Sequence, residues 1–354
     1  MKFKIDSHKL IYHPDVVAKL MAGERIVPVN MEISPSGACN LRCKFCAQSF
    51  LGYQPDILDK DVLLESIRSV SGKGLKAVVL AGEGEPLVNK QLPEMIHGID
   101  ECGIDIGMST NALLVNKEFS ADCLGKLKWV RVSLNAGTSK TYNEVHGKPE
   151  DFRGIELVLD NLADMVSLKK RENLDVTIGV QMVLIPDNRD EMVILAKRLK
   201  EIGVDYFTIK PFSWHKKMNV NFDDYVKLCS FDDVRDELHS LQTDTYNIIL
   251  RENALKSIKD GKCYEKCYGL PLWSYISSKG DVWPCLAYIG TEGYKYGNIY
   301  ESNLNEIVFS ETKKEIDEKM MNMDISDCRK ACRLEAINSY LSVLNEKVEH
   351  RNFI

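Results

Sequence analysis

Three closely spaced cysteines are the residues of this chain best placed to do chemistry. Cys39, Cys43 and Cys46 lie in the segment EISPSGACNLRCKFCAQSF, as a C-x3-C-x2-C loop that follows a strand-like run. Three thiolates in one compact loop can bind three irons of a cubane iron-sulfur cluster, which leaves the fourth iron open for chemistry. A structural zinc site would need a fourth ligand, and no cysteine or histidine follows at finger-like spacing.

Four cysteines nearer the carboxyl end could hold a second cluster. Twelve residues, Gly280 and four further residues separate Cys267 from Cys285, and Cys328 and Cys332 follow. A hairpin with a thiolate at each end and a returning cysteine pair would supply four ligands. Because all four irons would then be bound by protein, this cluster would accept or relay electrons rather than bind substrate.

Composition and charge limit what the chain can be. With 46 basic and 52 acidic residues, its net charge of -6 argues against a nucleic-acid-binding protein with a broad basic face. No apolar run approaches the roughly 20 residues that span a bilayer, and the start MKFKIDSHKL lacks a secretory apolar stretch. We therefore expect a cytoplasmic protein without nucleic-acid or membrane partners, whose clustered cysteines bind metal rather than form disulfides. Three isolated cysteines are expected to be small buried hydrophobes: Cys102, Cys123 and Cys229.

Alternating strand-like and helix-like segments must position the first cysteine loop. Six β-rich runs recur, separated by helix-length amphipathic stretches. Six βα units predict a parallel sheet with helices outside it. Two more units would be needed for a closed eightfold barrel, so we predict an α/β fold with a partial (β/α)6 TIM-like barrel, open along one side. The runs are VNMEIS (29–34), KAVVLAG (76–82), DIGMST (105–110), WVRVSL (129–134), TIGVQMVLI (177–185) and DYFTIK (205–210).

The pattern breaks after Lys210. An irregular linker with one short strand candidate, YNIILRE (246–252), is expected there. The cysteine-rich part that follows should contain a hairpin with Lys279-Gly280-Asp281 as its turn, and an amphipathic helix should end the chain. The expected divisions are an N-terminal extension (1–28), the barrel (29–210), the linker (211–260), the auxiliary module (261–335) and the C-terminal helix (336–354).

The first cysteine loop, with Phe45 directly before its last cysteine, resembles the hallmark of the radical S-adenosylmethionine (SAM) superfamily. In that family the open iron of a [4Fe-4S] cluster is chelated by the amino and carboxylate groups of SAM. An electron from the cluster cleaves SAM to methionine and a 5′-deoxyadenosyl radical, which abstracts hydrogen from the substrate. The resemblance implies the same cofactors here, and an electron donor such as flavodoxin or ferredoxin.

Motifs at three strand ends extend this resemblance. AGEGEPL resembles the GGE motif of the family, which implies that Gly84, Glu85 and Pro86 receive the SAM amino group, although Glu83 stands where glycine is usual. A carboxylate accepts hydrogen bonds from an ammonium, so Glu85 suits that role. STNA and VSLNAG follow at the carboxyl edge, where α/β barrels carry active sites. Their polar side chains would touch the SAM ribose and carboxylate by resemblance, or merely cap the following helices. These residues are Ser109, Asn111, Ser133 and Asn135.

The later cysteines resemble the auxiliary modules of the SPASM and twitch groups of the superfamily. A full SPASM module holds two auxiliary clusters with more cysteines than the five present here, so the resemblance favours a twitch module with one auxiliary [4Fe-4S] cluster on Cys267, Cys285, Cys328 and Cys332. The fifth, Cys263, could replace Cys267 as a ligand, donate a hydrogen atom near the substrate, or have neither role. In epimerases of similar architecture a cysteine thiol donates a hydrogen atom to the substrate radical, and Cys263 could be that donor.

The module layout is most similar to twitch enzymes such as 2-deoxy-scyllo-inosamine dehydrogenase and aminoglycoside epimerases. We therefore expect an oxidoreductase or epimerase that abstracts hydrogen from a small polar substrate: a carbohydrate, a cyclitol or a nucleotide-linked sugar. Dehydrogenation would use the auxiliary cluster as electron acceptor, whereas epimerisation would need a thiol such as Cys263. Lys210, His215 and Arg251 could bind an anionic group of the substrate, or form a solvated basic surface.

Two other functions stay open. Peptide maturases use similar auxiliary modules, but many carry a leader-binding domain before the barrel, and only 28 residues precede the first strand here. A non-enzymatic iron-sulfur protein with a structural or redox role would account for the cysteines. It would leave the three strand-end motifs without an explanation.

Overall fold

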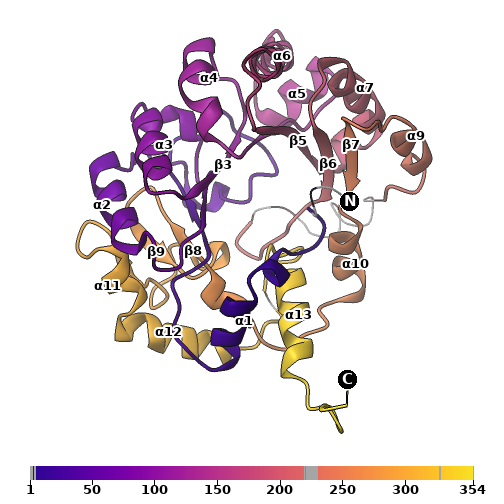
Figure 1. Cartoon of the computed structure of the whole chain (residues 1–354). Helices are drawn as coiled ribbons and strands as arrows, with labels where there is room; N and C mark the ends of the chain where they lie inside the picture. The colour runs from indigo at the N-terminus through magenta and orange to yellow at the C-terminus, as the bar shows by residue number, and fades with distance from the viewer. Residues whose placement is uncertain (1–2, 4, 219, 221–229, 327, 354) are drawn as a thin grey trace.

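One mixed sheet organises the computed structural model, which describes residues 3, 5–218, 220, 230–326 and 328–353 (Figure 1). Its ten strands run in the order β10-β9-β8-β1-β2-β3-β4-β5-β6-β7. Cys229, one of the three isolated cysteines, lies outside the described residues. Within those same ranges, no helix combines the length and the apolar character that a membrane span requires.

Eight neighbouring strands of this sheet, β8 and β1 to β7, are parallel, and β1 to β7 form the partial barrel. Six of these seven coincide with the predicted runs. The seventh confirms the short strand candidate YNIILRE (246–252), which was expected in a linker outside the barrel: Asn247 pairs with Tyr206, and the strand continues in register with β6. Three of its four residues are buried, and the strand covers the edge of β6 that would otherwise be exposed. The strands are β1 (Asn30–Ile33), β2 (Ala77–Leu80), β3 (Asp105–Thr110), β4 (Trp129–Ser133), β5 (Thr177–Leu184), β6 (Tyr206–Pro211) and β7 (Asn247–Leu250).

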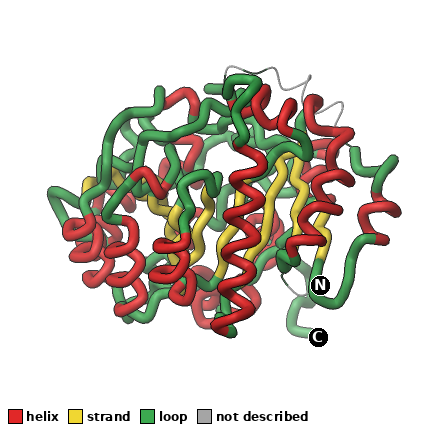
Figure 2. The backbone as a smooth tube through the Cα atoms, turned by 90° about the horizontal axis from the view of Figure 1, so that it is seen from above, coloured by secondary structure: helices red, strands yellow, loops and turns green. Residues whose placement is uncertain are grey.

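Amphipathic helices cover the outside of the barrel, as Figure 2 shows by the red helices around the yellow strands. Their apolar faces form one core with the outward-facing side chains of the strands. Local signals set their ends: the carboxylate of Asp59 accepts hydrogen bonds from the backbone N–H groups of Asp61 and Val62 at the start of α2. The helices are α2 (Lys60–Val70), α3 (Leu92–Glu101), α4 (Lys117–Cys123), α5 (Ser139–His146), α6 (Gly154–Glu172), α7 (Met192–Ile202), α9 (Arg235–Ser240) and α10 (Glu252–Asp260).

The cysteine-rich part continues the same sheet. β8 (Trp273–Ile276) pairs in parallel with β1, and β9 (Asp281–Trp283) returns antiparallel to β8. This is the predicted hairpin, and Gly280 in its turn has φ +79°, a conformation that favours glycine. The short β10 (Gly297–Asn298) pairs with β9. The helices that follow are α11 (Leu304–Val308), α12 (Glu311–Met321) and α13 (Glu335–Asn345).

The N-terminal segment packs against the C-terminal helix. Leu10, just before α1 (Pro14–Met21), shares a small apolar cluster with Leu272 and Leu341 of α13. Figure 1 shows α1 beside α13 accordingly. The buried carboxylate of Asp6 accepts a hydrogen bond from Nε of Arg251 at 2.8 Å, where β7 ends. The segment from Asp6 to Leu10 is therefore tied to both the barrel and α13.

Candidate active site

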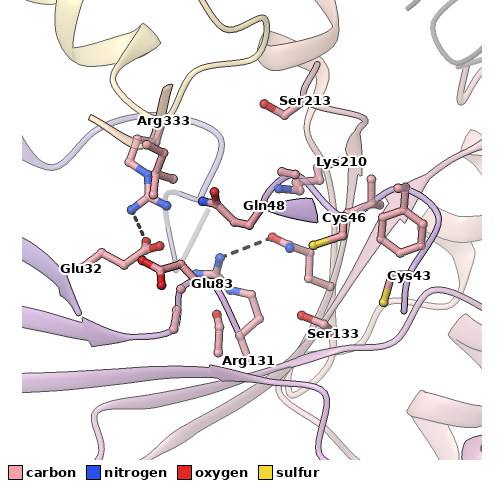
Figure 3. Close-up of a pocket in the computed structure, with 18 of the residues that line it drawn as sticks. Glu32, Cys43, Cys46, Gln48, Glu83, Arg131, Ser133, Lys210, Ser213 and Arg333 are labelled. Carbon is pink, nitrogen blue, oxygen red and sulfur yellow. Dashed lines mark hydrogen bonds and ion pairs between the residues drawn. The ribbon is translucent and has the colours of Figure 1, made fainter. Parts of the chain in front are cut away.

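A cavity of about 520 Å³ lies at the carboxyl ends of the barrel strands and is partly walled by the cysteine-rich part. Trp129, Arg131 and Ser133 of β4 line it, because successive side chains of a strand point to opposite faces. Val130 and Val132 between them are buried on the helix side. Figure 3 shows Cys43 and Cys46 on one side of this space, and Glu32 with Arg333 on the other.

Flat rings fill the barrel below the cavity. A Cβ atom on Gly107 of β3 would lie 2.1 Å from the ring of Trp129, and a Cβ on Gly179 of β5 would lie 2.1 Å from that of Tyr206. Glycine is therefore required at both positions, because any side chain would displace a ring that closes the interior. This packing keeps the open space at the carboxyl edge.

All three cysteines of the first loop line the cavity. Burial raises the pKa of Cys39 to about 11, and the charges of Glu85 and Cys46 add to this. Burial also raises the pKa of Cys43, with further contributions from Cys46 and Cys39, which places the three sulfurs close together. Three convergent thiols beside an open cavity fit a [4Fe-4S] cluster with one iron free of protein ligands. Binding such a cluster would displace the thiol protons.

The turn after β2 packs directly on this cysteine loop. The N–H of Glu85 donates to the carbonyl of Ala38 at 2.9 Å, and the N–H of Glu83 donates to Oγ of Ser34 at 3.1 Å. A Cβ atom on Gly84 would lie 2.0 Å from the carbonyl oxygen of Ala38, so only glycine allows this approach. The GEGEP turn thus holds the loop against the barrel edge.

Glu85 joins the ends of β2 and β3 from a buried position beside the cavity. One carboxylate oxygen accepts hydrogen bonds from Oγ1 of Thr110 at 2.6 Å and from the N–H of Leu87 at 3.3 Å. The other accepts from the N–H of Asn111 at 2.7 Å. Burial raises the pKa of Glu85 to about 7, although these hydrogen bonds lower it. The two oxygens offer about four lone pairs, so the carboxylate can accept a further donor.

The remaining predicted SAM residues fall into three groups. Ser109 and Ser133 line the cavity, and neither hydroxyl has a hydrogen-bond partner among the described residues. Asn111 also lines it, and its amide donates to Oδ1 of Asn40 in the cysteine loop at 2.6 Å. Asn135 lines it as well, but it is buried and accepts a hydrogen bond from the N–H of Val183, which ties β4 to β5.

The alternative that these residues cap the following helices is wrong. Asn116 provides the side-chain cap of α4, and Thr138 provides that of α5. Phe45 lines the cavity from a buried position against Val145 and Phe212. Pro86 is buried at the start of a 3-10 helix and is not among the described residues that line the cavity.

A histidine that the sequence analysis did not single out touches the first cysteine loop. Nδ1 of His146, the last residue of α5, lies 3.0 Å from Sγ of Cys43. Burial lowers the pKa of His146 to about 3, so the ring is neutral and can donate one N–H. No motif marks this residue, because it lies 103 positions away and is brought there by the turn of α5 onto the loop.

The four later cysteines converge at the edge of the module. Burial raises the pKa of Cys285 to about 12, and the charges of Cys332 and Cys328 add to this. The same neighbours act on Cys267, which precedes β8. Cys285 and Cys332 also line the cavity. Four partly buried thiols whose charges act on one another fit a fully protein-ligated [4Fe-4S] cluster.

Cys263 stays apart from this group. Its exposed thiol lies 3.1 Å from Oγ of Ser339, and it is not among the described residues that line the cavity. This placement gives no support to a hydrogen-atom donor. Cys123 is buried in the core, and Cys102 packs partly buried against it, as expected of isolated cysteines.

The predicted substrate residues are placed unequally. Lys210, at the end of β6, lines the cavity, and burial lowers its pKa to about 7, with the charge of Arg329 next in effect. Arg251 lines it too but is paired with Asp6. His215 is buried near the ring of Phe50 and is not among the described lining residues.

Three arginines of the cavity wall were missed from the sequence. Arg131 lies two positions before Ser133 in β4, so strand alternation alone would have placed it on the same face. Arg329 and Arg333 each follow a predicted cluster ligand in the segment CRKACR. Their position directly after predicted cluster ligands could have indicated that they lie near the site. Nε of Arg329 donates to Oγ of Ser213 at 2.7 Å, and Arg333 pairs with Glu32 at 2.5 Å.

Comparison with known families agrees with this geometry. Residues 33–199 match the Radical SAM superfamily, and residues 267–333 match SPASM, an iron-sulfur cluster-binding domain. The chain carries a radical SAM domain and a SPASM domain. The first implies a [4Fe-4S] cluster and SAM, and the second implies auxiliary iron-sulfur clusters. The predicted TIM-like fold and cofactors are confirmed, and the predicted auxiliary module matches the SPASM family.

Two curated relatives resemble parts of this chain. The FeMo cofactor biosynthesis protein NifB of Methanocaldococcus jannaschii is 29% identical over 199 residues, which is 50% of this chain and 65% of that protein. The sporulation killing factor maturation protein SkfB of Bacillus subtilis is 22% identical over 289 residues, which is 79% of this chain and 65% of SkfB. The chain thus spans about two thirds of the length of each of these two relatives.

A solved structure shares the fold over nearly the whole chain. The crystal structure of Streptococcus suis SuiB bound to precursor peptide SuiA has a TM-score of 0.66 at 19% identity, covering 96% of this chain and 78% of SuiB. None of these three proteins is a cyclitol dehydrogenase or an aminoglycoside epimerase, the enzymes with which the sequence was compared.

Proposed function

We propose that this chain is a radical SAM enzyme that abstracts a hydrogen atom from a substrate held in the cavity between its two domains. The observation that carries the proposal is that the three thiols of the first loop and the polar strand ends line one cavity. When bound, the [4Fe-4S] cluster and SAM supply an electron and a 5′-deoxyadenosyl radical, which removes hydrogen from the substrate. Cys39, Cys43 and Cys46 would hold this cluster.

The residues around the loop would bind and orient SAM. Glu85 offers a carboxylate with lone pairs to spare, and hydrogen bonds donated by the N–H groups of the SAM amine would favour its ionised form. The free hydroxyls of Ser109 and Ser133 and the side chain of Asn111 would bind the ribose and carboxylate. Phe45 packs the loop against the barrel and would help exclude water from the cavity.

The auxiliary site would hold a second cluster on Cys267, Cys285, Cys328 and Cys332. Arg329 and Arg333 lie beside these ligands, and their charges would offset part of the negative charge of four thiolates. Because Cys285 and Cys332 also line the cavity, this cluster would stand next to the bound substrate and could exchange electrons with it.

For the substrate, we propose a peptide. SkfB is a maturation protein and SuiB binds a precursor peptide, and both resemble this chain over the radical SAM and SPASM domains. One observation favours a second candidate, a small anionic molecule: the cavity is lined by more cations than carboxylates can pair. Dehydrogenation and epimerisation of a carbohydrate gain no support from these relatives.

Anaerobic reconstitution tests the proposed reaction. We expect about eight irons per chain, as two four-iron clusters require, and dithionite-dependent release of 5′-deoxyadenosine from SAM. Candidate peptides encoded beside the gene would then be incubated with the enzyme and checked by mass spectrometry for loss or gain of hydrogen. Iron binding without any cleavage of SAM would refute the proposed enzyme and favour a redox or structural protein.

A further inference from the structure

We propose that the cavity contains a subsite for an oxyanion, formed by Lys210, Arg131 and Arg329, and that the substrate carries the matching carboxylate or phosphate. The identity of the ligand as substrate rests on the proposed function. The existence of the subsite rests on the side chains alone.

None of these three cations has a carboxylate partner among the described residues. Five basic side chains line the cavity. Arg333 is paired with Glu32 at 2.5 Å, and Arg251 is paired with Asp6 at 2.8 Å. The three unpaired ones are Lys210, Arg131 and Arg329.

Neutral groups hold the two arginines, Arg131 and Arg329, in place. Arg131 donates to Oε1 of Gln181 at 3.3 Å and lies 4.7 Å from the centre of the Trp129 ring. Nε of Arg329 donates to Oγ of Ser213, and the terminal nitrogens of the guanidinium have no hydrogen-bond partner among the residues that the structure describes. These partners fix the orientation of each guanidinium without neutralising its charge. Figure 3 shows Arg131, Lys210 and Ser213 around the same space.

Gathering the three cations in one cavity costs free energy. Bringing three positive groups from separate segments into a partly dehydrated cavity is unfavourable, because burial and like charges both oppose the charged forms. The pKa of Lys210 reflects this cost: burial lowers it to about 7, and the charge of Arg329 contributes next. A bound oxyanion would reverse it by accepting charge-assisted hydrogen bonds from all three residues.

Two other anions must be separated from this one. The carboxylate of SAM is present in any radical SAM site, so the test is made with SAM already bound. The auxiliary cluster is negatively charged, and Arg329 follows its proposed ligand Cys328 directly. Lys210 and Arg131 lie on barrel strands, away from those ligands in sequence, and they therefore give the cleaner test.

The experiment uses the reconstituted holoenzyme with saturating SAM and no reductant. Inorganic phosphate and N-acetylglutamate are titrated separately by calorimetry. We expect saturable binding of at least one probe, weakened at least about tenfold in Lys210→Met and in Arg131→Met, since each removes a charged hydrogen-bond donor. Lys210→Arg, which keeps the charge, should retain most of the affinity. Lys128→Met is the matched control, because Lys128 is exposed at the opposite end of β4.

Each outcome decides something. Preference for phosphate supports the subsite with a phosphate ester as substrate, and preference for the carboxylate supports it with an acidic side chain of a peptide. Absence of binding by both probes, or equal binding by wild type and Lys210→Met, overturns the proposal. Release of 5′-deoxyadenosine by the wild type is measured separately, so failure of the proposed enzyme is distinguishable from failure of the subsite.

Discussion

The two cysteine groups differ in how they are assembled. Cys39, Cys43 and Cys46 come from one loop of eight residues, whereas the auxiliary thiols come from separate segments between Cys267 and Cys332. The first set needs only a local turn to converge. The second needs the β8–β9 hairpin and the return of the chain before α13. The proposed SAM-binding cluster would thus be held by one loop at the barrel edge, and the proposed auxiliary cluster by thiols that tertiary structure brings together.

Their surroundings differ in charge as well. The first loop lies beside the neutral ring of His146 and the buried carboxylate of Glu85. The auxiliary thiols lie beside Arg329 and Arg333. Since hydrogen bonds and nearby charges set the potential of iron-sulfur clusters, the two sites should differ in redox properties.

The largest expected effect separates the two groups by function. Cys43→Ala should remove about four irons per chain, as one cluster is lost, and abolish release of 5′-deoxyadenosine. Cys332→Ala should also remove about four irons but leave measurable, dithionite-dependent cleavage of SAM. Iron analysis and chromatography of the nucleoside check both. Equal loss of SAM cleavage in the two variants would contradict the division of roles.

A second prediction concerns Glu85. Its pKa of about 7 lies above that of a free glutamate, so the carboxylate becomes charged only as pH rises through 7. SAM affinity should therefore increase between pH 6 and 8 in the wild type. Glu85→Gln should lower the affinity about tenfold at pH 8, the loss of one charge-assisted hydrogen bond, and flatten this pH dependence. Equilibrium dialysis with labelled SAM measures both, and a Gln variant with unchanged pH dependence would exclude Glu85 as the ammonium acceptor.

His146 offers a way to sharpen the difference in surroundings. His146→Phe removes the ring nitrogen that lies against Cys43 and should weaken retention of the first cluster about tenfold against a chelator, a cost typical of groups that orient a metal ligand. The auxiliary cluster should keep its iron and its electron paramagnetic resonance signal. His97→Phe, at a partly exposed position of α3, is the control variant. Equal loss of both clusters would mean that His146 only supports the fold.

Lys210 should trade stability for binding. Because its pKa falls from 10.5 to about 7, the folded state binds this proton more weakly than the unfolded chain does. Its unfavourable contribution is therefore largest below pH 7 and fades as pH rises toward 10.5. Lys210→Met should raise the free energy of unfolding by about 1–2 kcal/mol at pH 6 and by less at pH 10. Urea denaturation checks this, and a variant that is less stable at pH 6 would contradict it.

The smallest effect is expected for Cys263. Its thiol is exposed and bonded to Ser339, outside the auxiliary group. Cys263→Ser should therefore keep about eight irons per chain and normal release of 5′-deoxyadenosine. Iron loss in this variant would make Cys263 a ligand, and loss of product formation alone would restore its role as a hydrogen donor.

Sequence reasoning reached what depends on local spacing and periodicity. The C-x3-C-x2-C loop and six barrel strands were predicted because thiol spacing and apolar runs are local properties. The strand Asn247–Leu250 was predicted as a short strand candidate, but its place in the barrel sheet was not, because only pairing with β6 reveals it. The contact of His146 with Cys43 spans 103 positions, which no local pattern encodes.

The charged wall of the cavity shows a different limit. Arg131 was predictable from strand alternation with Ser133, whereas the position of Arg329 depends on a loop held by Ser213. Asn135 was assigned to SAM from its motif, yet its amide ties β4 to β5. Residue type and strand end therefore locate the site, and the hydrogen-bond partners decide which side chains remain available to a ligand.

The parallel pairing of β8 with β1 makes the two cluster sites mechanically one body. Four residue pairs from Asn30–Trp273 to Ile33–Ile276 join the cysteine-rich part to the first barrel strand, only a few residues before Cys39. Pulling the auxiliary part away would break these backbone hydrogen bonds and expose an edge at the centre of the sheet. Heating should consequently melt both parts in one cooperative transition, and the spacing between the clusters should stay constant during turnover.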